Sequence, residues 1–161
     1  MLLYLIRHAH AGTRAGGPHD RYRPLSPDGQ ERAETLAGML ADRPIATVLS
    51  SPATRCVQTV EGIATGHGLA VIETDELFEG SRIDDAEHLL AGQTGPEVVA
   101  CSHGDLIPEL VEAVARRGAV MTGDRCRKGS IWILEHRDGR WTSATYVDRT
   151  VNELPDRPGP D

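Results

Sequence analysis

The chain has 161 residues, of which 39% are hydrophobic and 25% charged, as in ordinary soluble globular proteins. Its formal net charge of −7 argues against general binding to nucleic acids or anionic membranes. Cys56, Cys101 and Cys126 lack metal-ligand spacing, and the short apolar start lacks the basic leader of a signal peptide, so we expect a cytoplasmic location. We expect one domain over residues 1–150 and a Pro-rich tail over residues 151–161.

The first predicted element is an apolar run at residues 2–6, which is typical of a buried strand in a parallel sheet. Arg7-His8-Ala9-His10 follows it at once. In open α/β sheets, ligands bind beyond the carboxyl ends of the strands. An arginine and a histidine at that place indicate an anion site that contains a nucleophile or an acid–base group.

A first helix is predicted after a Gly- and Arg-rich loop over residues 11–23. Ser26 is expected to cap this helix, with Pro27 at its first position. The helix should stop before Pro44, because proline breaks the hydrogen-bonding pattern of a helix interior. A second apolar run, at residues 47–49, predicts the next strand.

Ser51-Pro52 then predicts a cap-and-proline start for a second helix, which should end near Gly66 or Gly68. Arg55 would lie close to the amino end of this helix, where the peptide dipoles favour an anion.

Residues 69–72 are expected to form a short strand, and residues 74–95 a loop region with one helical turn around residues 86–90. A segment of this length can form only a low wall beside the site, so we expect an open pocket. An open pocket suits a bulky phosphorylated substrate better than a small metabolite that needs enclosure.

A third apolar run, at residues 97–101, ends in Ser102-His103-Gly104. Asp105 is expected to cap the helix that follows. Asp138-Gly139 lies between two further strand-like runs and predicts a β-hairpin. The alternation of strands and helices predicts an α/β three-layer sandwich, with a mostly parallel sheet, helices on both faces and an antiparallel C-terminal hairpin.

Three predicted strands therefore end just before His8, Arg55 and His103. Because the carboxyl ends of neighbouring parallel strands meet at one edge of a sheet, we expect these side chains to share a pocket. Arg7 and Arg55 can each donate paired hydrogen bonds to phosphoryl oxygens. One histidine could attack phosphorus as a neutral imidazole, while the other holds the transferring oxygens.

The motifs at residues 7–10, 51–55 and 102–104 resemble, in order and spacing, the signature of the histidine phosphatase superfamily, which has the phosphoglycerate-mutase-like fold. Residues 24–29 also resemble the Leu-(Ser/Thr)-x-x-Gly segment that precedes the first helix of the family.

Within this family, the short chain resembles the small phosphohistidine phosphatases. Residues 102–108 and 127–132 look similar to the phosphatase half of actinobacterial Nudix–phosphatase fusions. No Nudix box is present, so the resemblance implies no nucleotide pyrophosphatase activity, but it suggests a functional link to a Nudix hydrolase.

The resemblance implies that His8 is the phosphohistidine nucleophile. It also implies that Arg7, Arg55 and His103 are the other side chains of the phosphate pocket, and that Gly104 supplies a backbone N–H donor. It implies no metal and no other cofactor. The expected partner is a phosphorylated protein or small molecule, with no nucleic acid and no membrane.

The proton donor is expected to be Glu79, in the Leu-x-Glu context that mutase-like members of the family carry. Glu76 is a competitor, and Asp105 is expected to be structural. His10 stands where the family often has Glu or Gln, so it either contacts substrate or is solvated at the mouth of the loop.

Arg14 and Lys128 are the preferred candidates for further substrate contacts at the rim of the pocket, among a larger set of basic residues. The other members of that set are Arg21, Arg23 and Arg82.

Other reaction classes fit the sequence less well. A cysteine phosphatase needs Arg six residues after its Cys, and those positions hold Gly62, Ile107 and Trp132. A metallohydrolase is a further rival, but two arginines aimed at the same pocket would oppose a cation. Its ligands would come from His8, His10, His19, Asp20 and His103.

The sequence thus predicts a metal-independent phosphohydrolase that acts, through a phosphohistidine intermediate, on phosphohistidine in a protein or on a nucleotide-type phosphate. A non-catalytic phosphate-binding module and a phosphomutase are the alternatives.

Overall fold

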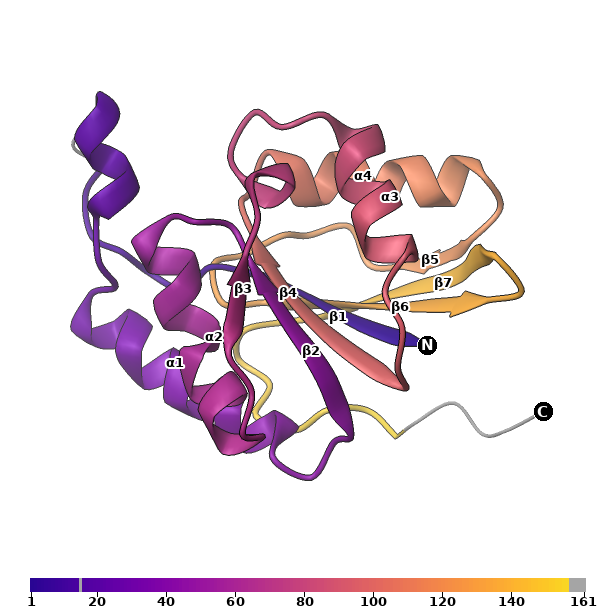
Figure 1. The fold of residues 1–161 in the computed structure, drawn as a ribbon, viewed down its shortest axis with the longest axis horizontal. Coiled ribbons are helices and arrows are strands. Elements are labelled where there is room, and N and C mark those ends of the chain that lie inside the picture. The colour runs from indigo at the N-terminus through magenta and orange to yellow at the C-terminus, as the bar shows by residue number, and fades with distance from the viewer. Residues whose placement is uncertain (15, 157–161) are drawn as a thin grey trace.

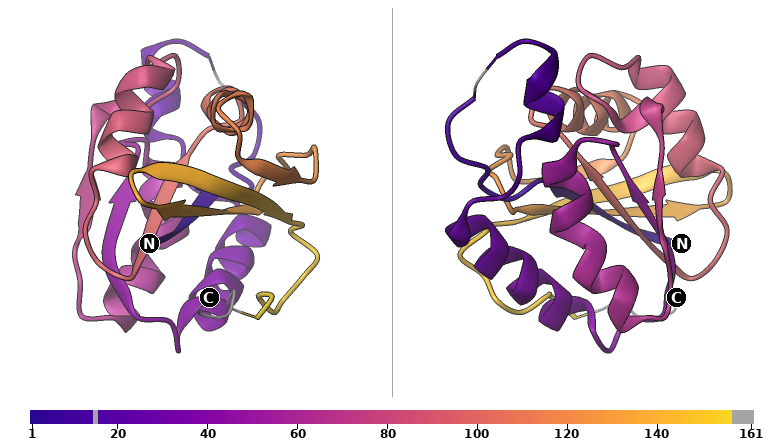
Figure 2. Two further views of the ribbon diagram at one scale, coloured as in Figure 1. Left: turned by 90° about the vertical axis from the view of Figure 1, so that its right-hand side faces the viewer. Right: turned by 60° about the vertical axis from the view of Figure 1, so that its left-hand side comes forward.

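The computed structural model describes residues 1–14 and 16–156, and within them a seven-stranded sheet lies between two layers of helices (Figures 1 and 2). The strands are β1 (Leu2–Arg7), β2 (Ile45–Ser50), β3 (Val71–Glu73), β4 (Glu97–Ser102), β5 (Val120–Thr122), β6 (Ile131–Arg137) and β7 (Arg140–Val147). The helices are α1 (Pro27–Leu40), α2 (Thr54–Gly66), α3 (Ile83–Ala91) and α4 (Leu106–Arg116), with short 3-10 turns η1 (Pro18–Tyr22) and η2 (Asp75–Leu77).

The sheet has the order β3-β2-β4-β1-β6-β7-β5. Strands β3, β2, β4 and β1 are parallel to one another, whereas β6 is antiparallel to both β1 and β7, and β5 is parallel to β7. This confirms the predicted three-layer α/β fold with an antiparallel hairpin. It also places the carboxyl ends of β1, β2 and β4 at one edge of the sheet, because these strands run the same way.

Side chains of β1 alternate between the two faces of the sheet. Tyr4 and Ile6 pack into the core on the side of α1 and α2, whereas Leu3 and Leu5 pack into the core on the side of α3 and α4. All four are at most 1% exposed. A strand buried on both faces needs a continuous apolar run, which is the pattern that predicted it.

Helix α1 begins where the sequence predicts. The Ser26 hydroxyl accepts a hydrogen bond from the backbone N–H of Gly29 at 3.2 Å. The carbonyl oxygen of His10 would lie only 2.0 Å from a Cβ added to Gly29. The start of α1 therefore packs against the backbone of the loop that follows β1, and only glycine allows this approach.

The predicted start of α2 is wrong, because the helix begins at Thr54 and Ala53 stands at its cap. Ser51 instead continues the sheet, since its backbone N–H donates to the carbonyl of Cys101.

Helix α3 is also longer than the single predicted turn. It buries Ala86 and Leu90 one turn apart, on the side that packs against α4.

The predicted hairpin is confirmed, and its turn residues Asp138 and Gly139 both have positive φ angles. Strand β3 lies at residues 71–73, two residues later than expected at its start. Strand β5 is not predicted by the sequence. Its residues are exposed, so they form no buried apolar pattern, and it joins the sheet only by pairing with β7.

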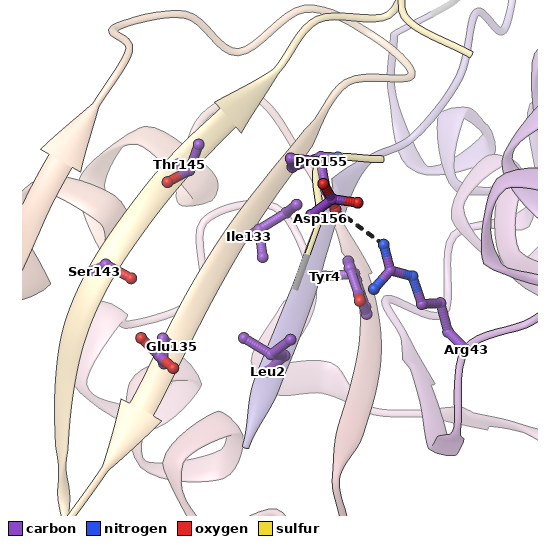
Figure 3. A pocket seen from close by; sticks show the side chains of 9 residues that line it. All are labelled: Leu2, Tyr4, Arg43, Ile133, Glu135, Ser143, Thr145, Pro155 and Asp156. Atoms are coloured by element: carbon purple, nitrogen blue, oxygen red, sulfur yellow. Dashed lines mark hydrogen bonds between the residues drawn. The ribbon is translucent and has the colours of Figure 1, made fainter. Parts of the chain in front are cut away.

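The part of the predicted tail that the structure describes runs along the molecule to Asp156. Leu154 packs against the core on the α1 side, and the carbonyl oxygen of Pro155 accepts a hydrogen bond from Arg43 at 3.0 Å. Figure 3 shows this contact beside a hollow of about 240 Å³ over β1, β6 and β7. Residues 157–161, the end of the predicted tail, lie outside the described residues. Among the described helices, none is both long enough and apolar enough to cross a bilayer.

Candidate active site

The side chains that the sequence singles out meet beyond the carboxyl ends of β1, β2 and β4. His8 follows β1, His103 follows β4, and Arg55 lies in the first turn of α2, after β2. The ring centroids of His8 and His103 are 5.4 Å apart, and the rings meet edge to face at 63°. Neighbouring parallel strands thus bring together residues that are far apart in the sequence.

His8 is 4% exposed, and its Nδ1 lies 2.8 Å from the carbonyl oxygen of Ala9. A carbonyl oxygen can only accept, so Nδ1 carries the hydrogen and Nε2 keeps its lone pair. Burial lowers the pKa of His8 to about 3, and the positive charges of Arg55 and Arg7 act in the same direction. At neutral pH, His8 is therefore an uncharged imidazole with a nucleophilic Nε2.

Helix α2 holds the loop that carries His8. The backbone N–H of Ala9 donates to the hydroxyl of Thr59 at 3.0 Å, and that hydroxyl donates to the carbonyl of Arg55. On the other side, the backbone N–H of Gly129 lies within hydrogen-bond distance of the carbonyls of Arg7 and His8. These contacts fix the backbone around His8 from both directions.

Arg55 is 1% exposed and joins two acidic residues. Its Nη1 donates to the carbonyl of Asp20 at 2.9 Å and lies 3.5 Å from an Asp20 carboxylate oxygen. Its Nη2 lies 3.1 Å from Oε1 of Glu79. Asp20, itself 6% exposed, also pairs with Arg23, so it anchors the loop before α1 against the site.

Arg7 lies flat against the backbone of Gly104. A Cβ added to Gly104 would lie 2.5 Å from Cζ of Arg7, closer than any real contact. A further hydrogen bond joins Nη1 of Arg7 to the carbonyl of Cys126. Gly104 is therefore required by the space that the Arg7 guanidinium occupies. Its predicted role as a backbone donor stays a prediction.

Three buried polar atoms of this region have no hydrogen-bond partner among the described residues. They are Nε of Arg7, Nε of Arg55 and the hydroxyl of Ser130. Ser130 is the neighbour of Arg7 across the β1–β6 pair, since its carbonyl accepts from the Arg7 backbone N–H. Buried donors without partners are costly, and a bound oxyanion would satisfy them.

His103 is fully buried, and its two nitrogens face different groups. Nδ1 lies 3.4 Å from Oε1 of Glu79 and 3.4 Å from Nη2 of Arg55. Nε2 lies 2.7 Å from the hydroxyl of Ser51 and 3.5 Å from Sγ of Cys56. Ser51 and Cys56 are contacts that the sequence analysis missed.

Of the three acid candidates, the structure places Glu79 at the pocket. Glu76 is exposed and hydrogen-bonded to Thr74. Asp105 stands at the N-cap position of α4, as predicted, but its side chain makes no capping bond. Its carboxylate accepts from the backbone N–H of Gly80 at 2.9 Å instead. Asp105 therefore secures the loop that carries Glu79.

The rim of the site is basic. Arg14 lies 3.1 Å from the second carboxylate oxygen of Glu79. Partial burial lowers the pKa of Lys128, and so do the charges of Arg7, Arg23 and Arg55. Lys128 therefore lies close enough to these three arginines for their positive charges to act on its ammonium group.

Other basic candidates are less engaged with the site. His10 is exposed, with Nδ1 2.7 Å from the hydroxyl of Ser26, which belongs to the loop before α1. Arg21 lies over the ring of Phe78 at 5.9 Å, whereas Arg82 is exposed and pairs with Asp85. Whether any rim residue touches substrate stays a prediction.

A cleft of about 320 Å³ opens from the ion pair of buried Arg55 and half-buried Glu79 toward solvent. One wall is made by Arg14, Gly17, Pro18, Asp20 and Arg21, and the other contains Phe78. The hollow of Figure 3 lies near Leu2, at the opposite end of β1 from His8. Within residues 1–14 and 16–156, no group of three or more His, Cys, Asp or Glu side chains is arranged to hold a metal ion.

The model of the histidine phosphatase superfamily (branch 1) matches residues 3–84, about half of the chain. The chain belongs to this superfamily. The match covers His8, Arg55 and Glu79, and the fold places His103 against them.

Solved structures share the fold of this histidine phosphatase superfamily member. The protein histidine phosphatase SixA, solved with tungstate, has a TM-score of 0.72 and 23% identity, over 88% of this chain and 93% of that chain. A SixA structure from Agrobacterium tumefaciens has a TM-score of 0.68 and 27% identity, over 91% of this chain and 97% of that chain.

Among curated proteins, an uncharacterized protein of Mycobacterium tuberculosis is 35% identical over 89 residues. This match covers 50% of our superfamily member and only 44% of the relative. The chain thus matches less than half the length of this relative.

Sequence reasoning missed Asp20 and Ser51 as parts of this superfamily site. The sequence offers Asp20 only as a candidate metal ligand, although an acid inside an Arg-rich loop is also a signal for an ion pair. The Ser51-Pro52 pair predicts a helix cap, and its sequence context gives no sign that the Ser51 hydroxyl reaches a histidine 52 residues away.

Proposed function

We propose that the protein is a metal-independent phosphohydrolase that forms a phosphohistidine intermediate at His8. The observation that carries this proposal is the hydrogen bond from Nδ1 of His8 to the carbonyl of Ala9. It leaves an unprotonated Nε2 in a buried pocket that also contains Arg7 and Arg55. A neutral nucleophile beside two guanidinium groups suits attack on a phosphoryl group.

In the first step, the lone pair of Nε2 forms a bond to phosphorus, and the bond from phosphorus to the leaving group breaks. The arginines balance the negative charge on the transferring oxygens, and His103 donates a hydrogen bond to them. Glu79, when protonated, gives its proton to the leaving group. Water then attacks phospho-His8, Glu79 takes its proton, and inorganic phosphate and free His8 result.

The contacts of Glu79 suit this role. Its Oε1 lies where the donors Nη2 of Arg55 and Nδ1 of His103 converge. A phosphoryl oxygen would compete with Glu79 for the same donors, so substrate binding would release the carboxyl group toward the leaving group. The side chain of Glu79 is 28% exposed, which leaves it room to move.

For the substrate, we propose a phosphohistidine in a protein or a nucleotide-type phosphate. The cleft is walled by Arg14, by residues of the short segment 17–21 and by residues 78–79, rather than by a long inserted lid. The structurally similar SixA proteins, one of them a protein histidine phosphatase solved with the oxyanion tungstate, support the first choice. A functional link to a Nudix hydrolase remains a prediction from sequence resemblance.

The proposal is tested by measuring phosphate release in excess EDTA from three classes of substrate: a phosphohistidine protein, nucleoside phosphates and sugar phosphates. Wild type should turn over at least one of the first two. His8→Ala should lose all measurable turnover while still binding tungstate, because Arg7, Arg55 and His103 remain. Wild type should form an acid-labile phosphoenzyme during turnover, and His8→Ala should form none.

His88→Ala is the matched control, since His88 is an exposed histidine on α3, remote from the pocket. It should leave turnover unchanged. Loss of wild-type activity in EDTA would support a metal-dependent reaction instead. Tungstate binding without turnover of any substrate would support the non-catalytic module, and full activity of His8→Ala would exclude His8 as the nucleophile.

A further inference from the structure

The inner nitrogen of His103 has a buried hydroxyl as its nearest partner. Nε2 lies 2.7 Å from Oγ of Ser51, and both residues are 0% exposed. Ser51 is not part of the predicted set of catalytic residues. Its position is fixed by the sheet, because its backbone N–H donates to the carbonyl of Cys101 at 2.9 Å.

The hydrogen bonds of Ser51 indicate which group carries the hydrogen. Oγ has two recorded partners among the described residues, Nε2 of His103 and the backbone N–H of Ala53 at 3.3 Å. The N–H can only donate, so Oγ accepts from it. The hydroxyl hydrogen of Ser51 then has one acceptor within reach, the lone pair of Nε2. If Nε2 were protonated in the neutral ring, a buried hydroxyl hydrogen would be left unpaired.

The outer nitrogen has two polar neighbours. Nδ1 of His103 lies 3.4 Å from Oε1 of Glu79 and 3.4 Å from Nη2 of Arg55, and Nη2 lies closer, at 3.1 Å, to that same oxygen. Because Nη2 has this nearer acceptor, the carboxylate oxygen accepts from both donors if Nδ1 carries a hydrogen. The alternative, in which Nη2 donates to an unprotonated Nδ1, is the one that the Ser51 hydroxyl disfavours.

Cys56 is the other side chain beside Nε2. Its Sγ lies 3.5 Å from Nε2, whereas Oγ of Ser51 lies 2.7 Å from it. Burial raises the pKa of Cys56, but hydrogen bonds with Cys101 and His103 outweigh burial and lower this pKa to about 6, so the sulfur competes with Ser51 for Nε2. The shorter distance favours Ser51. Oγ of Ser51 is therefore the stronger partner of this nitrogen.

We infer that Ser51 is a positioning residue that holds neutral His103 in the Nδ1–H tautomer. The single N–H of the ring then faces the pocket, where the transferring phosphoryl oxygens would lie. The same hydroxyl can rotate and accept from Nε2–H when the ring is protonated, so His103 keeps an N–H toward the pocket in both charge states. The catalytic consequence rests on the proposed phosphatase function, whereas the tautomer itself does not.

The tautomer is measured directly by ¹⁵N NMR of the histidine rings in the full chain, at a pH where the His103 ring is neutral. The His103 signals are assigned by their loss in His103→Gln. Wild type should show a protonated Nδ1 and an unprotonated Nε2 for His103. Ser51→Ala should lose this preference, and its signals should shift toward the Nε2–H form. Cys56→Ala should keep the wild-type pattern.

Kinetics on the substrate that wild type turns over gives the second readout. Ser51→Ala should lower kcat/KM about 10-fold, the size of effect expected for one lost hydrogen bond between neutral groups. Ser51→Cys, which keeps a weaker donor, should fall between this variant and wild type. Ser50→Ala is the matched control, because it removes a neighbouring buried hydroxyl that donates to the Ser51 carbonyl and does not contact His103.

The two arms separate failure of this inference from failure of the proposed function. An Nε2–H tautomer in wild type, or a Ser51→Ala spectrum identical to wild type, would overturn the inference whatever the activity. Equal losses of activity in Ser50→Ala and Ser51→Ala would overturn it as well, because they would indicate a general effect on the fold. If wild type has no turnover, the NMR arm still decides the tautomer.

Discussion

The two histidines of the site differ in what their inner nitrogens contact. Nδ1 of His8 faces a carbonyl oxygen, which can only accept, so this ring keeps one tautomer and its Nε2 stays free to attack. Nε2 of His103 faces the Ser51 hydroxyl, which can donate or accept. The neighbouring oxygen therefore determines which ring nitrogen carries the hydrogen in each histidine. Sequence patterns do not reveal this difference between the two rings.

At the same scale, the contact between Gly104 and Arg7 gives a sharp prediction. A Cβ in Gly104→Ala would meet the Arg7 guanidinium at 2.5 Å, and Arg7 would have to leave its place. Because Arg7 is expected to bind the phosphoryl oxygens, Gly104→Ala should weaken tungstate binding about 10-fold or more, as expected when a charged hydrogen-bond donor is displaced. Isothermal titration calorimetry with tungstate measures this.

The control for this variant is Gly38→Ala in α1, where an added Cβ meets no atom within 4 Å. It should leave tungstate binding unchanged and stabilise the fold by about 0.5–1 kcal/mol, as alanine does in a helix interior. Wild-type affinity in Gly104→Ala would mean that Arg7 does not contribute to anion binding.

At the scale of elements, the site is built from segments that directly follow strands β1, β2 and β4. The apolar runs that form these strands are visible in the sequence, and parallel pairing makes their ends meet, so the positions of His8, Arg55 and His103 could be predicted. The predicted start of α2 is wrong, and Asp105 lacks the capping bond expected of it, for one physical reason. Their polar side chains satisfy tertiary partners, His103 and Gly80, which local sequence rules do not consider.

The loop between η2 and α3 carries the prediction that belongs to this scale. It holds Glu79 against Arg55 and His103. Glu79→Gln keeps the shape of the side chain but cannot give up a proton. It should slow hydrolysis of a phosphomonoester by about 10²-fold or more, within the usual range for general acid catalysis. Hydrolysis of a phosphoramidate should slow less, because its leaving group needs a different arrangement of protons. The kcat values for both substrates measure the difference.

Glu76→Gln is the matched control, since Glu76 is exposed, three residues away, and hydrogen-bonded to Thr74 rather than to the site. It should leave both rates unchanged. Equal slowing of both substrates by Glu79→Gln would assign the proton donor to another group.

At the scale of the whole molecule, an acidic chain concentrates positive charge at one edge of its sheet. The net charge is −7, yet the pKa of Lys128 is lowered by its partial burial and by the charges of Arg7, Arg23 and Arg55, which all lie close enough to act on it. Low-dielectric walls strengthen such a field inside a cleft. Anions would therefore be drawn to the cleft in spite of the negative net charge.

The chain after β7 makes contacts away from the catalytic side chains, so stability and activity should separate there. Leu154 packs against the core, and Pro155 accepts from Arg43 beside the hollow of Figure 3. A chain that ends at Asn152 loses both contacts but keeps the bond from Arg32 to the Val151 carbonyl.

We expect this truncation to lower the free energy of unfolding by about 1 kcal/mol, from partly buried apolar surface, and Tm by roughly 2–4 °C. Because His8 lies at the other end of β1 from the hollow, kcat should stay within about twofold of wild type, less than loss of one hydrogen bond would cause. Thermal denaturation and kinetics check the two expectations. A chain that ends at Asp156 keeps every contact named here and serves as the control. A large loss of kcat in the shorter chain alone would mean that residues 153–156 support the site itself.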